Sequence, residues 1–273
     1  MNIEIIRQKY IKLGYTRANA IAKVCQDVIL NLISKSAYFR NVTIKGGVVM
    51  HSISNDKRRA TRDIDLDFIK YSLEDTSIIN FIEKLNNNED GIIIKINGNI
   101  EKLHHQDYDG KRVNIIVSDS FNNVMNTKLD IGVHKNFDIA QEEYCFDLNA
   151  INSTANLFVN SCEQIFIEKL KSLLKFGILS TRYKDIFDFY YLINNVNINK
   201  DKFNKYIDEI IYKDDTLEEK NINDIISKLK TIFSNRLFIR NLNDARNNWL
   251  ELPVDEVLKK IYIFLESMEK ITV

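Results

Sequence analysis

The most informative part of the sequence consists of two stretches, Lys45-Gly46-Gly47 and Arg59-Ala60-Thr61-Arg62-Asp63-Ile64-Asp65-Leu66-Asp67-Phe68. In the second stretch aspartates alternate with apolar residues from position 63 to position 68, which predicts a strand with one carboxylate face and one apolar face. Three like charges within about 13 Å along one face repel each other. A hard divalent cation held by oxygen ligands would relieve that repulsion. The alternative is an edge strand with a solvated acidic face.

The glycine pair favours the first of these interpretations. Gly46 and Gly47 follow a short apolar segment, 42–44, and another apolar segment, 48–50, comes directly after them. A glycine pair that begins a helix lets backbone N–H groups approach a phosphate. Carboxylates for a metal and a glycine turn for phosphates, on neighbouring elements, predict a site for a nucleoside triphosphate. The turn before the carboxylates is rich in basic residues, which are Lys57, Arg58, Arg59 and Arg62.

The order K-G-G, a spacer and then R-x-T-x-D-x-D resembles the nucleotidyltransferase toxins of the abortive-infection AbiEii/AbiGii type, which include the MenT toxins. These toxins belong to the polymerase-β-like nucleotidyltransferase superfamily, which more widely has Gly-Ser in place of the glycine pair. A second block of the family, an E-K-L helix followed by K-D-x-x-D, is matched by Glu168-Lys169-Leu170 and Lys184-Asp185-Ile186-Phe187-Asp188. The resemblance spans residues 45–188, and about the last 80 residues add nothing to it.

Composition narrows the class of protein without naming a function. The chain has 273 residues, of which 45% are hydrophobic and 28% charged, and its formal net charge is zero. Any contact with RNA must therefore come from a local basic patch. Three cysteines without a C-x-x-C motif argue against a disulfide framework and fit a reducing cytoplasm. With no signal-peptide pattern and no apolar run of spanning length, we expect a cytoplasmic protein that does not enter the membrane.

Periodicity changes part-way along the chain. Strand and helix patterns alternate up to about residue 157, and helical periodicity takes over from Ser161. We therefore predict an α+β protein, in which a nucleotidyltransferase domain over 1–157, with a mixed sheet and flanking helices, precedes a helical bundle over 158–273. The predicted helices of the second part are 161–176, 182–195, 200–212, 217–233, 241–250 and 254–271.

A third carboxylate is expected on a strand next to the acidic one. In the fold that the resemblance implies, a neighbouring strand supplies this group. Asp130 lies in a predicted strand, 124–133, and fits the position better than Asp119, which lies in a polar turn. The alternative for Asp130 is an exposed aspartate at the end of a strand.

Helical periodicity places two charged residues on apolar faces, where they need partners. Lys169 falls inside the apolar arc of the helix predicted over 161–176. In the next helix, over 182–195, Asp185 falls inside the arc and Asp188 lies outside it. Lys169 either extends its ammonium group to solvent, pairs with Asp185 to hold two helices together, or supplies positive charge to a bound triphosphate.

The resemblance implies a role for each of these residues. The implied ligands of two Mg²⁺ ions, with Mn²⁺ as an alternative, are Asp63, Asp65 and Asp130. The implied catalytic set is Asp63, Asp65, Asp130, Lys169 and Asp185. The implied nucleotide-binding set is Lys45, Gly46, Gly47, Arg59, Thr61 and Lys169. Within these sets, Arg59 and Lys169 would neutralise the leaving pyrophosphate, and Asp185 would orient Lys169 or the nucleotide.

The function expected from the resemblance is transfer of a nucleoside monophosphate from an NTP to an acceptor hydroxyl, with RNA such as the 3′ end of tRNA as acceptor. The same resemblance implies a toxin with a cognate antitoxin. Two alternatives stay open, a nucleotide-binding protein without turnover and a nucleotidyltransferase or phosphotransferase acting on a small molecule. The sequence has no P-loop, no G-x-S-x-G motif and no zinc-ligand spacing of histidine and cysteine.

Overall fold

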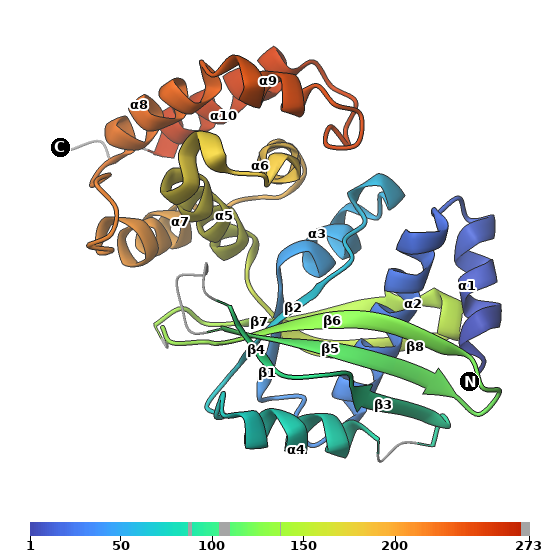
Figure 1. Cartoon of the computed structure of the whole chain (residues 1–273). Coiled ribbons are helices and arrows are strands. Elements are labelled where there is room, and N and C mark those ends of the chain that lie inside the picture. The colour runs from blue at the N-terminus through green and yellow to red at the C-terminus, as the bar shows by residue number, and fades with distance from the viewer. Residues whose placement is uncertain (87–88, 104–109, 137, 269–273) are drawn as a thin grey trace. The chain divides into compact units, whose positions relative to one another are not determined.

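The structure is a computed structural model, which describes residues 1–86, 89–103, 110–136 and 138–268. The chain divides into two compact units, the first unit Met1–Asn160 and the second unit Ser161–Val273 (Figure 1). Over the described residues, strands occur in the first unit, and the second unit is helical. The predicted α+β class, with a mixed sheet and flanking helices followed by a set of helices, is confirmed.

A mixed sheet forms the centre of the first unit. Its strands are β1 (Val42–Lys45), β2 (Ile64–Phe68), β3 (Ile92–Ile96), β4 (Glu101–Leu103), β5 (Gly110–Asp119), β6 (Val124–Val133), β7 (Glu142–Leu148) and β8 (Ser153–Val159). They lie in the order β3-β5-β6-β2-β1-β8-β7, and β4 pairs with β5. The β2–β6 and β1–β8 pairs are parallel and the other pairs are antiparallel. The acidic strand β2 is therefore an interior strand, between β1 and β6.

The apolar face of β2 belongs to the core, as its alternating sequence predicts. Ile64, Leu66 and Phe68 are all 0% exposed. The ring of Phe68 packs edge-on against Phe81 of helix α4 (Asp75–Leu85), with 5.2 Å between ring centroids. Burial of each of these side chains stabilises the fold by about 1.5–3 kcal/mol. The carboxylates are consequently fixed on the opposite face of an interior strand.

Four helices frame this sheet, and three of them, α1, α2 and α3, begin at capping or glycine residues. Asn2 caps α1 (Ile3–Lys12) by accepting a hydrogen bond from the N–H of Ile5, and Thr16 caps α2 (Arg17–Lys35) in the same way. Helix α2 packs against α1, β6 and β8, while α4 lies along β3. Helix α3 (Gly46–Ser54) follows β1 directly and begins at the glycine pair. The end of β1 and the start of α3 thereby lie beside β2.

The second unit is held together by aromatic packing between helices. Its helices are α5 (Cys162–Phe176), α6 (Tyr183–Asn195), α7 (Lys200–Ile207), α8 (Ile222–Phe233), α9 (Arg236–Leu242) and α10 (Val254–Met268), with a π-helical turn at Asp208–Tyr212. The ring of Phe166 on α5 lies 4.5 Å from that of Phe189 on α6 and also contacts Phe203 and Phe264. Ser161 caps α5 through the N–H of Gln164. These contacts tie α5, α6, α7 and α10 into one core.

The helix predicted over 241–250 is wrong. The structure has α9, Arg236–Leu242, and then a series of turns. Asn235 caps the start of α9 through the N–H of Phe238, and Asn243 at its end donates a side-chain hydrogen bond to the carbonyl of Ile239. In the turns that follow, Asn248 accepts a hydrogen bond from the N–H of Leu252. Polar side chains that bond to nearby backbone favour caps and turns over helix interiors. Trp249, in this turn region, is nevertheless buried at 1% exposure.

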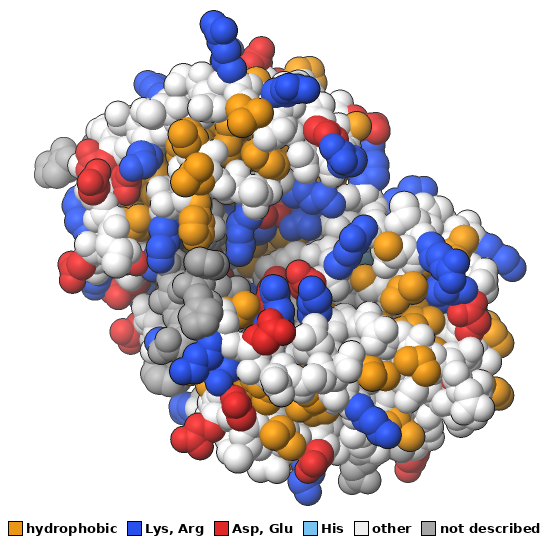
Figure 2. Space-filling view, in the orientation of Figure 1, with side chains coloured by type: hydrophobic (Ala, Val, Ile, Leu, Met, Phe, Trp, Pro, Cys, Tyr) orange, Lys and Arg blue, Asp and Glu red, His pale blue; other side chains and the backbone are white. Residues whose placement is uncertain are grey.

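Charged side chains of both signs are interspersed on the face of the molecule that Figure 2 shows. This distribution accords with the formal net charge of zero. Across the described residues, no helix combines the length and the apolar character that a membrane crossing requires.

Candidate active site

Four charged residues form one row across neighbouring strands of the sheet. Lys45 on β1 pairs in register with Asp65 on β2, Asp65 pairs with Asp130 on β6, and Asp130 pairs with Arg112 on β5. Neighbouring strands lie about 4.8 Å apart, and side chains of residues in register project from the same face. The structure therefore brings Asp65 and Asp130, two of the predicted metal ligands, next to each other on one face.

The glycine pair fits against this row because it lacks side chains. Gly46 has a φ of +65°, and a Cβ atom there would lie 2.4 Å from Oδ2 of Asp65. A Cβ atom at Gly47 would lie 2.7 Å from both Cβ and Oγ1 of Thr61. Real Cβ atoms do not approach other atoms so closely, so both positions require glycine. The first turn of α3, with its N–H groups and partial positive charge, is thus held against the acidic strand.

Asp67, the third aspartate of the strand, has a different environment. Its Oδ1 atom lies 2.7 Å from Nζ of Lys45, and both side chains are less than a tenth exposed. This buried ion pair compensates the charge of Asp67 within the protein. Lys45 was predicted to bind nucleotide, and the structure places its ammonium group on Asp67. The repeat of three aspartates is thus divided between one internal ion pair and two residues, Asp63 and Asp65, that are partly exposed.

Arg112 neutralises Asp130 from the neighbouring strand. Its Nε and Nη2 atoms each donate a hydrogen bond to Asp130, one to Oδ1 and one to Oδ2, and both distances are 2.7 Å. These hydrogen bonds, together with the charges of Asp130, Asp63 and Glu101, raise the pKa of Arg112. Asp63 thus acts electrostatically on the same guanidinium group that Asp130 binds. Sequence reasoning missed Arg112, which becomes visible only once the β5–β6 register is known.

Arg59 and Thr61 lie in the segment that leads into the acidic strand. Arg59 ends the short turn Lys57–Arg59 and is 4% exposed. Asp56 caps this turn by accepting a hydrogen bond from the N–H of Arg58 at 2.8 Å. The carbonyl oxygen of Thr61 accepts a hydrogen bond from the side chain of Gln26 on α2 at 2.9 Å. The segment is thereby fixed to the core, and the nucleotide-binding roles of Arg59 and Thr61 stay predictions.

In the second unit, Lys169 lies between two aspartates of α6. Its Nζ atom donates a hydrogen bond to Asp185 and lies 3.0 Å from Oδ2 of Asp188. Lys169 is 7% exposed and Asp188 0%, while the Asp185 side chain is 13% exposed, so one buried ammonium group serves one buried and one partly buried carboxylate. The predicted pairing of Lys169 with Asp185 is present. The placement of Asp188 outside the buried arc was wrong, because an ion pair with α5 buries a residue that apolar periodicity excludes.

The carboxylates of the first unit suit a divalent cation such as Mg²⁺. Such an ion is bound by one or two protein carboxylates together with substrate phosphates and water. Asp65 and Asp130 provide two such groups on adjacent strands, beside a glycine that leaves room for close approach. Within the described part of the chain, no group of three histidine, cysteine, aspartate or glutamate side chains is arranged as a ready metal site. A two-carboxylate site completed by substrate therefore fits better than a protein-only site.

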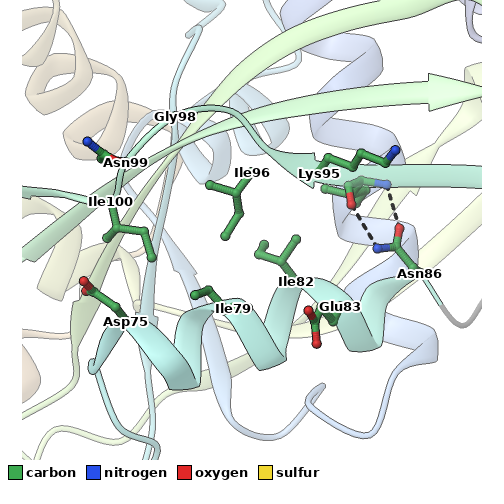
Figure 3. Close-up of a pocket in the computed structure, with 11 residues that line it drawn as sticks. Asp75, Ile79, Ile82, Glu83, Asn86, Lys95, Ile96, Gly98, Asn99 and Ile100 are labelled. Atoms are coloured by element: carbon green, nitrogen blue, oxygen red, sulfur yellow. Dashed lines mark hydrogen bonds between the residues drawn. The ribbon is translucent and has the colours of Figure 1, made fainter.

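A separate hollow of about 820 Å³ lies between α4 and β3 (Figure 3). Its inner surface is formed mainly by the isoleucines Ile79, Ile82, Ile94, Ile96 and Ile100. Asn86 closes one end, where its side chain donates to the carbonyl of Ile94 at 2.9 Å and accepts from the same residue's N–H at 2.6 Å. The predicted site residues are not among those that line it, so this apolar hollow is distinct from the acidic row.

The chain was compared with protein families, with solved structures and with curated proteins. The profile of a family described as "Nucleotidyl transferase AbiEii toxin, Type IV TA system" matches residues 28–258. Among solved structures, the chain is similar to an antigenic nucleotidyltransferase-like protein from Paracoccidioides brasiliensis, with a TM-score of 0.46 and 16% identity over 81% of this chain and 91% of that chain. The comparison with curated proteins gives no match. The family match includes the glycine pair, the acidic row and the Lys169 cluster, and the chain belongs to the AbiEii family of nucleotidyltransferase toxins.

Proposed function

We propose that this nucleotidyltransferase moves a nucleoside monophosphate from an NTP to a hydroxyl group of RNA, with the 3′ end of tRNA as the first candidate, and that it requires Mg²⁺. The proposal is carried by the placement of Asp65 and Asp130 on neighbouring strands next to Gly46. Two carboxylates beside a helix N-terminus provide ligands for a hard cation and N–H donors for phosphates at the same place. The RNA acceptor rests on the toxin character of the family.

The predicted residues of the first unit have separate parts in this proposal. Asp65 and Asp130 would hold Mg²⁺, with Mn²⁺ as the alternative ion, and Asp63 stays a predicted third ligand. The chemistry that the bound ions supply is stabilisation of negative charge on the attacking and leaving oxygens. Gly46 and Gly47 bring the N–H groups of α3 to the triphosphate.

The transfer itself exchanges one phosphorus–oxygen bond for another. The acceptor hydroxyl oxygen attacks the α-phosphorus, the bond from that phosphorus to the bridging oxygen breaks, and pyrophosphate leaves. Asp130 accepts the proton of the acceptor hydroxyl. Its carboxylate oxygens retain lone pairs for this role, because each can accept two hydrogen bonds and Arg112 donates one to each.

The second unit contributes two further proposed residues and one proposed partner. By resemblance, Lys169 would neutralise charge on the pyrophosphate, and Asp185 would orient Lys169. A cognate antitoxin, encoded separately, opposes the activity, as the type IV toxin–antitoxin description of the family implies. The test of the lysine is whether Lys169→Arg, which keeps the charge, retains transfer that Lys169→Gln loses while both variants stay folded.

Transfer can be measured by incubating the protein with each α-labelled NTP, Mg²⁺ and total RNA. We expect label to appear in a discrete RNA band, with tRNA as the first candidate. Asp65→Asn or Asp130→Asn should lower the rate by about a hundredfold or more, because each removes a charged ligand of the proposed metal site that stabilises the reacting phosphates. The matched control is Asp75→Asn, which neutralises a carboxylate of the same unit that is 55% exposed and pairs with Lys111.

Two results would contradict the proposal. If folded wild-type protein transfers no label to RNA from any NTP, the RNA acceptor is wrong. If Asp65→Asn and Asp130→Asn keep full activity while their circular dichroism spectra match wild type, the acidic row is not the active site.

A further inference from the structure

Arg112 occupies a distinctive position among the charged residues of the first unit. It binds Asp130 through both carboxylate oxygens, at 2.7 Å each, from the adjacent strand β5. It also lies within the electrostatic influence of Asp63. Asp63 and Asp130 are two of the three residues predicted to hold the metal. The guanidinium therefore places positive charge directly on Asp130, a carboxylate that a divalent cation would use.

The pair also differs from the other ion pair of this face. Lys45 and Asp67 are 9% and 7% exposed, so that pair is closed to solvent. Arg112 is 31% exposed, whereas its partner Asp130 is only 8% exposed. An exposed guanidinium on a buried carboxylate can move to water without leaving an uncompensated charge, provided that another cation takes its place on the carboxylate. The geometry of the Arg112–Asp130 pair therefore allows another cation to replace the guanidinium on Asp130.

We propose that Arg112 and the divalent cation compete for the carboxylate of Asp130, so that Arg112 sets the affinity of the metal site. This inference rests on the proposed function, because it takes Asp130 as a metal ligand. A guanidinium and a divalent cation bound to the same carboxylate would lie about 4–5 Å apart, where like charges repel each other strongly. Metal binding at Asp130 therefore weakens the Arg112–Asp130 hydrogen bonds, and loss of Arg112 strengthens metal binding.

The direct test is Mn²⁺ binding, followed by the electron paramagnetic resonance signal of free Mn²⁺ without nucleotide. Arg112→Gln should bind Mn²⁺ about tenfold more tightly than wild type, a change equivalent to about 1.4 kcal/mol. Arg112→Lys keeps the charge but loses the bidentate contact, so its Mn²⁺ affinity should lie between those of wild type and Arg112→Gln. The matched control is Lys111→Gln, which removes one positive charge from the adjacent residue of β5, where the lysine pairs with Asp75 at 2.7 Å. Its affinity should equal that of wild type.

Wild-type protein gives an independent readout that needs no variant at Arg112. Titration with Mg²⁺ should shift the Nε–H resonance of Arg112 and speed its exchange with water, and Asp130→Asn should remove this response. If Arg112→Gln binds Mn²⁺ with unchanged or weaker affinity than wild type, while wild type binds one ion through Asp65 and Asp130, the competition is wrong and the metal site stands. If neither protein binds Mn²⁺, either alone or with a non-hydrolysable NTP analogue present, the metal site fails, and this inference fails with it.

Discussion

The acidic row of the first unit and the Lys169 cluster of the second unit compensate aspartate charge in different ways. In the first unit, Asp130 and Asp67 each have a cation of their own from a neighbouring strand, at 2.7 Å in both cases. In the second unit, one ammonium group, that of Lys169, serves two carboxylates. The Arg112–Asp130 pair, whose guanidinium is 31% exposed, leaves room for exchange with a bound ion, whereas the Lys45–Asp67 pair is closed to solvent. A single cation shared by the fully buried Asp188 and the partly buried Asp185 has no such freedom, and its removal must be costly for folding.

The largest expected effect is that of Lys169→Met. It removes the shared cation of the fully buried Asp188 and the partly buried Asp185, and loss of one partner of a buried pair costs about 3–5 kcal/mol of unfolding free energy. Urea denaturation followed by tryptophan fluorescence can measure the loss, because Trp249, the single tryptophan, lies in the second unit at 1% exposure. An unchanged transition midpoint would show that the cluster does not hold the second unit together.

Lys45→Met provides the matched comparison in the first unit. It leaves one buried carboxylate, Asp67, and not two, so we expect a smaller loss of unfolding free energy, still of about 3 kcal/mol. Labelling of Cys25 can follow this unit, since burial protects the thiol and raises its pKa to about 12. The experiment uses a Cys145→Ser, Cys162→Ser background. Faster labelling of Cys25 in Lys45→Met, with little change in Lys169→Met, would show that each ion pair stabilises its own unit. The reverse pattern would contradict that conclusion.

Gly46→Ala tests the close approach of α3 to the acidic strand. The new Cβ would lie 2.4 Å from Asp65 at a φ of +65°, so we expect a loss of about 1–3 kcal/mol from overpacking and backbone strain, with reduced transfer. Gly98→Ala is the matched control, because that glycine also has a positive φ, of +85°, but nothing lies within 4 Å of its added Cβ. Equal stability losses in the two variants would mean that strain alone, and not contact with Asp65, explains the effect.

The smallest expected effects separate the two aspartates of the second unit. Asp185→Asn keeps the contact of Lys169 with Asp188 and should cost about 1 kcal/mol or less, as for a hydrogen bond that a neutral group can still accept. Asp188→Asn alters a side chain that is 0% exposed and should cost more. Equilibrium unfolding followed by Trp249 fluorescence measures the loss of unfolding free energy in each variant. A larger loss for Asp185→Asn than for Asp188→Asn would contradict this account of the cluster.

The sequence was sufficient for the face of the acidic strand, because alternation assigns Asp65 and Asp67 to one side without any knowledge of neighbours. Asp63, predicted on the same face, lies in the bend before β2. The sequence was insufficient for strand pairing. The Asp65–Asp130 neighbour relation was expected from the family, whereas Arg112 requires the antiparallel register of β5 on β6, which no local pattern supplies. Strand β8, Ser153–Val159, escaped prediction although Ala155, Leu157 and Val159 alternate as buried residues, since the segment is short and leads directly into α5.

In the helical half, periodicity located the major helices and failed where polar side chains act on the backbone. The segment 241–250 has helical spacing, but asparagine and aspartate residues cap it and bond to their own turns. Asp188 shows the complementary failure. It lies in the quoted K-D-x-x-D block yet was placed outside the buried arc, because its burial depends on an ion pair with another helix. Charge pairing across elements is the information that one-dimensional patterns lack.

If the acidic row of the first unit can exchange its cation and the Lys169 cluster cannot, a divalent cation should bind at the acidic row. The most direct measurement is the anomalous scattering of crystals grown with Mn²⁺ and a non-hydrolysable NTP analogue. We expect a peak about 2.0–2.6 Å from carboxylate oxygens of Asp65 and Asp130, with the triphosphate next to Gly46. Occupied ion density at Asp185 and Asp188, with none at Asp65 and Asp130, would contradict the account.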